Sequence, residues 1–287
     1  TVPLTPAEVW QALTAPDTHT AAHFIVVQVR LPQVITALLA GAALAAGGLV
    51  MQALFANPLA DPSLLGVNSG ASLGAALAML ALGGNFAIGT TTLSGMALTV
   101  AAAFAGACAV IALLLVCSRI VRGNTALLVC GIMLSLLLSA VISLLSFYAT
   151  ADGVRSFMLW GLGSFAGVPL SRLPAFALVT LLTLAALFPL AQSLNALLLG
   201  PDYAANLGIR VRRVRTRLLL LTGLLTATVT ALCGPVSFIG LAVPHAARLL
   251  LRSADHRRLL PACLLLGADV ALLALIGAVK VAQTACA

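Results

Sequence analysis

Long apolar runs alternate with short polar stretches along the 287 residues of the chain. The runs are continuous, and about 20 consecutive apolar residues are enough for a helix to cross a bilayer. We expect eight such helices, at about residues 33–54, 64–82, 93–117, 125–149, 173–192, 218–233, 235–251 and 259–279. The pattern therefore predicts an all-α, polytopic membrane protein.

The polar stretches predict how the rest of the chain is organised. Residues 1–29 are expected to form a periplasmic segment that leads into the membrane, with one short helix near 7–13. Residues 30–279 form the helical bundle of a single domain, and 280–287 form a divergent or truncated tail. Residues 151–168 are too short and too rich in glycine to span, so we expect an interfacial or re-entrant helix there, with Trp160 at headgroup depth.

Composition excludes several classes of protein. With 62% hydrophobic and 8% charged residues, the chain is not a soluble globule. The six cysteines stand singly with no histidine at ligand spacing, so no metal site is expected. The only lysine is Lys280, preceded by Val279, so the chain lacks the Gly-Lys-Ser/Thr of a phosphate-binding loop and cannot supply that kind of ATP site.

The basic residues predict the orientation in the membrane. With eight alternating spans, the connections at 55–63, 118–124, 193–217 and 246–258 share one side and hold 11 basic residues, against 4 on the other side. Because cytoplasmic loops carry the excess of Arg and Lys, this side is expected to be the cytoplasm.

The longest polar interruption is Leu199–Arg217, which joins two spans on the cytoplasmic side. Pro201 suits the first position of a short helix, and Gly208 suits a left-handed stop just beyond its end. Two interpretations stay open. The stretch is either an ordinary loop anchored by its arginines, or a helix that a partner protein grips.

Small and polar residues within the spans also allow two interpretations. Asn68 and Ser69 could line a polar path, as could a row of serines on one helix face, Ser135, Ser139, Ser143 and Ser146. Alternatively, the serines bond to the preceding helical turn. The glycine-rich stretches at 41–48 and 66–76 predict close helix packing. Asp269 is either a functional acid or a polar residue that faces the bundle.

Several stretches together resemble the FecCD family of membrane permeases, the transmembrane subunits of type II ABC importers for iron-siderophores, haem and cobalamin. The matching segments are RLP at 30–32, GAALAAGGLVMQALFANPLADPSLLGVNSGASLG at 41–74, LWGLGSFAG at 159–167, LGPDYAANLGI at 199–209, GPVSFIGLAVPHAARLL at 234–250 and DHRRLLP at 255–261.

The resemblance implies a fold of ten spans, of which the eight here are the second to ninth. It also implies a homodimer in the bacterial inner membrane, with two cytoplasmic ATPase subunits and a periplasmic solute-binding protein. The expected cargo is an iron chelate, either a siderophore complex or haem; cobalamin is the alternative. The chain itself would not be an enzyme and would bind no cofactor, because ATP and Mg would sit on the partner subunits.

The resemblance also assigns residues. The coupling helix that seats in the ATPase comprises Pro201, Asp202, Tyr203, Ala204, Ala205, Asn206, Leu207 and Gly208. The cytoplasmic gate falls on Gly123, Asn124 and Thr125. Arg30 would dock the binding protein, although Gln33 replaces the second arginine of the family's RLPR motif. After residue 268 the sequence departs from the family pattern.

Two other functions compete with this one. An ion-coupled secondary transporter needs several acids or unwound half-helices within the membrane, and Asp269 is the one clear acid available. A structural scaffold would have neither a polar path nor a coupling helix.

Overall fold

The computed structural model describes residues 5–14, 21–83, 85–88, 91–121 and 123–285. The elements in chain order are α1 (Pro6–Thr14), α2 (Ala21–His23), η1 (Phe24–Arg30), α3 (Leu31–Phe55), η2 (Pro62–Leu65), α4 (Val67–Ala76), η3 (Leu77–Ala81), β1 (Asn85–Ile88), β2 (Thr91–Ser94), α5 (Met96–Ile120), α6 (Asn124–Tyr148), α7 (Ala151–Gly161), η4 (Phe165–Gly167), α8 (Leu173–Leu187), η5 (Phe188–Leu190), α9 (Ala191–Leu198), α10 (Pro201–Asn206), α11 (Val211–Cys233), α12 (Ile239–Leu251) and α13 (His256–Ala285).

Each of the eight predicted spans coincides with a helix. Six of these helices are long and apolar enough to cross a membrane, namely Ala21–Phe55, Met96–Ile120, Thr125–Tyr148, Leu173–Leu198, Val211–Cys233 and His256–Val281. The other two, Val67–Ala81 and Ile239–Leu251, are short. At 1.5 Å per residue they are about 22 Å and 20 Å long, less than the thickness of the hydrocarbon core. The fold is therefore all-α and multi-pass, with two helices that begin inside the bundle.

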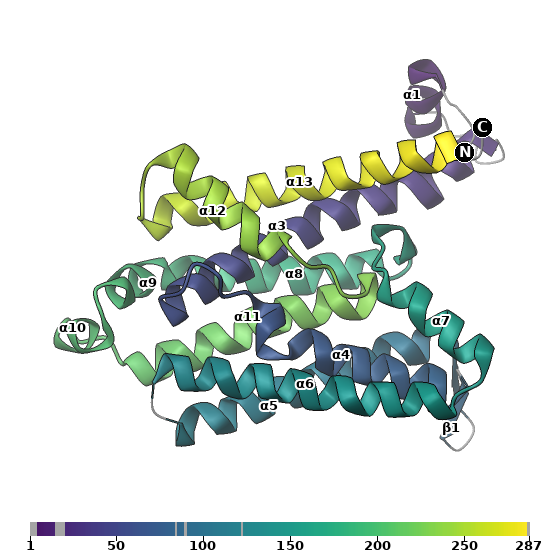
Figure 1. The fold of residues 1–287 in the computed structure, drawn as a ribbon. Coiled ribbons are helices and arrows are strands. Elements are labelled where there is room, and N and C mark those ends of the chain that lie inside the picture. Colours follow the sequence, from purple (N-terminus) through teal and green to yellow (C-terminus); the bar gives the residue numbers. More distant parts are fainter. Residues whose placement is uncertain (1–4, 15–20, 84, 89–90, 122, 286–287) are drawn as a thin grey trace.

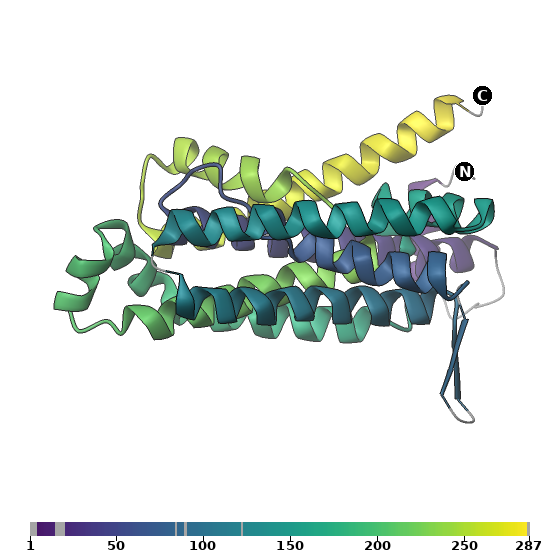
Figure 2. The same cartoon turned by 60° about the horizontal axis from the view of Figure 1, so that its bottom comes forward.

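Three boundaries differ from the sequence prediction. α11 begins at Val211, so the arginine run lies in the first turns of a helix rather than in a loop. The predicted span at 93–117 begins only at Met96, because β1 and β2 form an antiparallel hairpin that the apolar pattern did not predict. This hairpin projects from the bundle (Figure 2). The helix expected at 173–192 continues to Leu198 through the short η5 turn.

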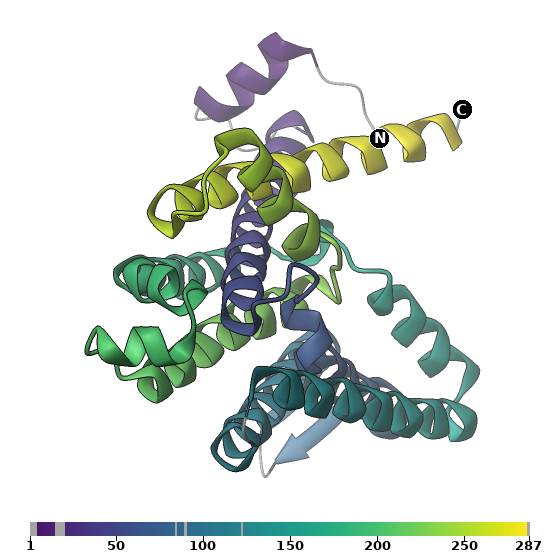
Figure 3. The ribbon, with the colours of Figure 1, turned by 60° about the vertical axis from the view of Figure 1, so that its left-hand side comes forward.

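α3 is the central helix of the bundle (Figure 3), and it packs against α13, α11 and α12. A β-carbon on Gly41 would meet the backbone carbonyl of Gly267 in α13. One on Gly48 would overlap the carbonyl of Gly240 in α12. The backbone of α3 therefore touches the backbones of α13 and α12 at positions where any side chain would hold the helices apart. The prediction of close packing at the glycine-rich stretch is confirmed.

The arginine-rich connections gather at one end of the bundle. α9, α10 and the α12–α13 connection lie at the left in Figure 1, and α7, the hairpin and α1 lie at the right. The predicted short helix near 7–13 is α1, which begins in a capping box: Thr5 N donates to Glu8 Oε2 at 2.7 Å, and Glu8 N donates to Thr5 Oγ1 at 3.4 Å.

Candidate functional site

α10 is the expected coupling helix, and it stands out from the arginine-rich end (Figure 1). Gly200 precedes it with a φ of 107°, Pro201 occupies the first turn, and Gly208 follows it with a φ of 81°. These are conformations that glycine adopts at little cost. The expected helix start and left-handed stop are therefore confirmed.

The surface of α10 is almost entirely free in this chain. Ala204 is fully buried, whereas Asp202, Tyr203 and Leu207 are exposed, the last two by 51% and 59%. The other predicted coupling residues, Pro201, Ala205, Asn206 and Gly208, are exposed as well. Within 201–208, Ala204 is therefore the one residue buried against the rest of the bundle.

The four predicted pathway residues, Asn68, Ser69, Ser139 and Ser143, lie together around one hollow of about 460 Å³. It lies between the start of α4, the middle of α6 and the segment that leads into α12. The complete lining is Ser63, Asn68, Ser69, Ser72, Ser139, Ile142, Ser143, Pro235 and Ser237. None of these residues is charged, so the hollow is polar but electrically neutral.

Hydrogen bonds fix part of this lining. Asn68 Oδ1 accepts from Thr230 Oγ1 of α11 at 2.8 Å, which satisfies a side chain that is 9% exposed. Ser143 donates to the carbonyl of Ser139 at 3.0 Å. Ser135 and Ser146 also bond to the preceding helical turn, and neither of them lines the hollow. Bonding within the helix and exposure to the hollow are thus compatible for Ser143.

The predicted gate residues form the turn between α5 and α6. Gly123 has a φ of 101°, and both Gly123 and Thr125 are exposed. The carbonyl of Gly123 accepts from Nη2 of Arg215 in α11 at 3.3 Å. Asn124 begins α6, and its side chain is outside the described part of the structure. In the described part of this turn, the hydrogen bond from Arg215 is the side-chain bond that joins it to α11.

Arg30, the predicted docking residue, ends η1 directly before α3, and α3 begins at the opposite end of the bundle from α10 (Figure 1). It is half-buried and lines a cleft of about 340 Å³ that also contains Gln33 and Lys280. Two positive side chains therefore border one cleft, although they come from opposite ends of the sequence.

The sequence interpretation missed a polar junction between α3 and α12. Pro244 lacks an N–H, so the carbonyl of Gly240 has no helical donor four residues on. The buried Gln52 supplies a donor instead: its Nε2 lies 3.5 Å from the Gly240 carbonyl and 3.2 Å from the Leu241 carbonyl. Its Oε1 accepts from Nη1 of Arg248 at 2.5 Å. Two features of the sequence could have indicated this junction, namely a glutamine within an apolar run and a proline within a predicted helix.

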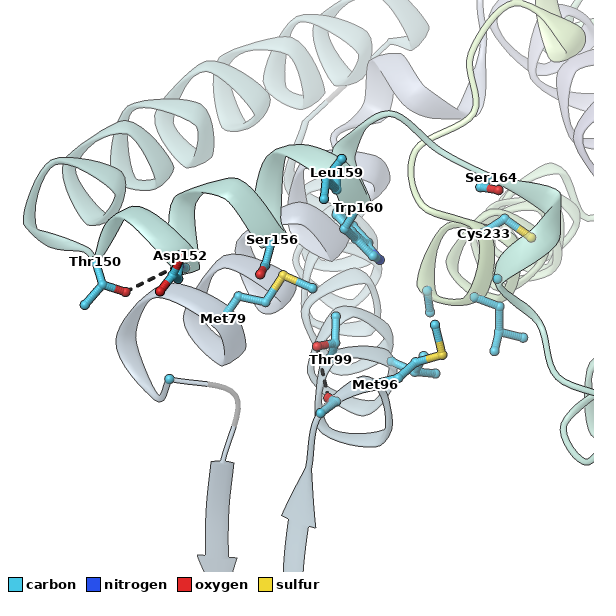
Figure 4. A pocket seen from close by; sticks show the side chains of 17 residues that line it. Met79, Met96, Thr99, Thr150, Asp152, Ser156, Leu159, Trp160, Ser164 and Cys233 are labelled. Atoms are coloured by element: carbon cyan, nitrogen blue, oxygen red, sulfur yellow. Dashed lines mark hydrogen bonds between the residues drawn. The ribbon is translucent and has the colours of Figure 1, made fainter. Parts of the chain in front are cut away.

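A second cavity, of about 560 Å³, lies beneath α7 and contains none of the predicted site residues. Figure 4 shows Trp160 reaching from α7 toward Thr99 and Met96 of α5, with Asp152 at the far end. α7 confirms the helix expected within 151–168. Asp269, whose role the sequence left open, is exposed on α13. Among the described residues, no three potential ligands of the His, Cys, Asp or Glu type gather as a metal site would require.

Comparisons with known proteins match this architecture. The profile of the FecCD transport family covers residues 1–285. The hemin transport system permease protein HmuU of Yersinia pestis is 38% identical over 260 residues, which are 88% of this chain and 76% of the relative. The vitamin B12 import system permease protein BtuC of Klebsiella pneumoniae is 39% identical over 259 residues, covering 90% and 74%.

A solved structure described as an inward-facing conformation of a metal-chelate type ABC transporter has the same fold. Its TM-score is 0.80 at 31% identity, and the match covers 93% of this chain and 85% of that one. The relatives are permease proteins, so this chain is a transport component rather than a catalytic subunit. The chain belongs to the FecCD transport family and is a multi-pass inner-membrane permease of an ABC importer.

Proposed function

We propose that this permease moves an iron chelate, a siderophore complex or haem, across the inner membrane by alternating access. The observation that carries the proposal is the uncharged hollow lined by Asn68, Ser69, Ser139 and Ser143. Hydroxyl and amide groups bind a large organic cargo weakly, and passage requires binding that is weak enough to release. Cobalamin is the alternative cargo, because relatives for hemin and for vitamin B12 are equally similar.

A second copy of the chain completes the pathway in this proposal. Ser139 and Ser143 are exposed on α6. Within an 18-residue apolar stretch of this helix, only 17% is buried inside the chain. Polar side chains in the middle of a span avoid lipid and face a protein interior or water. A homodimer in which the α6 faces of two chains approach each other would enclose these hydroxyls around a central path.

Two further kinds of partner follow from the two ends of the bundle. α10 would seat in a cytoplasmic ATPase subunit, with one such subunit for each permease chain. ATP and Mg would be bound by the ATPase, and the permease chain itself would need no cofactor. The turn at Gly123, Asn124 and Thr125 would close the path on the same side. A periplasmic solute-binding protein would dock at the end that carries Arg30.

Reconstitution tests the proposal. The chain is placed in proteoliposomes with its partner ATPase and binding protein, and ATP-dependent uptake of haem, a ferric siderophore and cobalamin is compared. Uptake of haem or the siderophore supports the iron-chelate assignment, and uptake of cobalamin alone replaces it with the alternative. If ATP is hydrolysed without uptake of any of the three, the proposed cargo class is wrong.

A further inference from the structure

Asn195 joins the segment that carries the coupling helix to the start of α13. It lies on α9, five residues before Gly200 and α10. Its Nδ2 donates to Oδ1 of Asp255 at 2.6 Å. Its Oδ1 accepts from the backbone N of His256 and from Nδ1 of the same residue, both at 2.8 Å. One amide group therefore makes three bonds to two consecutive residues.

These bonds complete the N-terminus of α13. The first N–H groups of a helix have no partner within it. Asp255 Oδ1 accepts from the N–H of Arg257 at 3.0 Å, and Asn195 covers the N–H of His256. The Arg257 N–H, followed by the Asn195 amide, lowers the pKa of the Asp255 carboxyl below its usual value. Asp255 thus stays ionised and keeps its bond to Asn195 at neutral pH.

His256 makes the junction rigid. Its side chain is 1% exposed, and Nε2 is buried with no hydrogen-bond partner among the described residues. The ring is therefore held by packing and by its Nδ1 bond to Asn195. A buried polar group that loses its partner is costly, so this contact resists breaking when α9 moves.

The segment 191–208, described in full, has few other attachments of this kind. The hydrogen bonds of α10 and its flanks run between near neighbours, such as Ile209 N to Ala204 O at 3.1 Å. Within 191–208, the hydrogen bonds that reach another part of the bundle are those of Asn195. α9 packs against both α13 and α3, and α13 in turn packs along α3.

We propose that Asn195 is a positioning residue that passes movement of the coupling helix to α13, and from there to α3. The inference rests on the proposed role of α10 as the contact with an ATPase. When the ATPase displaces α10, α9 moves with it, and the three Asn195 bonds pull on the first turn of α13. Because α13 and α3 meet backbone to backbone at Gly41 and Gly267, the two helices shift as a pair.

The test compares four variants in proteoliposomes with the ATPase and binding protein, measuring complex assembly, ATP hydrolysis and cargo transported per ATP. Asn195→Leu retains the size of the side chain and removes every bond. We expect this complex to assemble and hydrolyse ATP, while cargo per ATP falls by on the order of tenfold, within the range of coupling energies between sites. Gln192→Leu, an exposed site on the same helix, is the matched control and stays at the wild-type ratio.

The swapped pair tests the geometry itself. Asn195→Asp alone places two carboxylates side by side and lowers the ratio. In the swapped pair, Asn195→Asp with Asp255→Ser, donor and acceptor change places: the introduced hydroxyl donates to the introduced carboxylate and still accepts from the N–H of Arg257, so the ratio recovers. An unchanged ratio in Asn195→Leu, or a swapped pair no better than Asn195→Asp, overturns the inference. If Asn195→Leu does not assemble, the single and swapped aspartate variants decide. A wild-type chain that does not assemble with the ATPase overturns the proposed function instead.

Discussion

Oε1 of Gln52 in α3 accepts a hydrogen bond from Nη1 of Arg248 in α12 at 2.5 Å. Nε2 of the same side chain donates to the carbonyls of Gly240 and Leu241, just before Pro244. The Gln52 side chain thus bonds the Arg248 guanidinium and also replaces the helical donor that Pro244 lacks. Gln52 is 3% exposed, so its loss would leave the carbonyl of the buried Gly240 without a donor, beside the half-buried Arg248. The junction explains why a polar residue persists in the most buried helix of the bundle.

Gln52→Leu should lower the free energy of unfolding by about 2 kcal/mol, because it leaves a buried backbone carbonyl without a donor and removes a hydrogen bond from the half-buried guanidinium of Arg248. Thermal unfolding of the purified protein in detergent measures the change. Gln192→Leu, on the exposed side of α9, is the control and should stay within about 0.5 kcal/mol of wild type. Equal effects of the two substitutions would show that the junction contributes no stability.

Asp202→Arg, or deletion of 201–207, should abolish uptake while the protein remains folded in the membrane. Asp202 is exposed on a helix whose one buried residue is Ala204, so the change removes a docking surface rather than a core contact. Uptake and ATP hydrolysis are measured together with the partner subunits. Asp152→Arg, at the opposite end of the bundle, is the control. Cargo-stimulated ATP hydrolysis that survives the Asp202 change would contradict the coupling assignment.

Gly48→Ala should destabilise the protein by about 1–3 kcal/mol, because its β-carbon would overlap the carbonyl of Gly240 and force α3 and α12 apart. Gly277→Ala on α13 is the matched control: its β-carbon meets nothing within 4 Å. Alanine is the better helix former, so this variant should lose no stability. Unfolding midpoints of the two proteins in the same detergent decide between a packing effect and a general effect of removing glycine.

The capping box of α1 should weaken only in acid. The backbone N–H of Thr5, and then its hydroxyl, lower the pKa of Glu8 from its usual 4.5. The carboxylate is ionised in both folded and unfolded chains above that value, so its contribution is complete there and disappears as the pH falls through the lower folded pKa. Hydrogen exchange in α1, corrected for the intrinsic rate, should show lost protection in that window. Glu8→Gln should remove the pH dependence, and an unchanged profile in this variant would assign it to another group.

Arg30→Glu should weaken docking of the binding protein more at low salt than at high salt, because mobile ions screen an ion pair at a surface. Affinity is measured at several ionic strengths, and Arg155→Glu, at an exposed arginine of α7, provides the comparison. Arg30 is half-buried beside Lys280, so part of its charge faces the cleft. A loss of affinity that does not change with salt would argue for a packing role instead.

The sequence was sufficient for the features that depend on local chemistry. Apolar run length placed all eight helices, since a bilayer demands backbone hydrogen bonds within each segment. Pro201 and Gly208 marked the ends of α10, because each residue has a backbone preference that needs no partner. The alternation of eight spans predicted which connections share an end of the bundle, and the excess of arginines predicted that this end is cytoplasmic.

Tertiary structure decided what depends on segments distant in sequence. The apolar pattern placed Val67–Ala81 and Ile239–Leu251 among the spans, and the structure shows why these helices are short: Pro62–Leu65 forms the separate helix η2, and residues 234–238 form no helix. The bonds of Gln52 to Arg248 and of Asn195 to Asp255 and His256 join residues up to 196 positions apart. A polar side chain in an apolar run shows that a partner is needed, but only packing brings that partner within hydrogen-bonding distance.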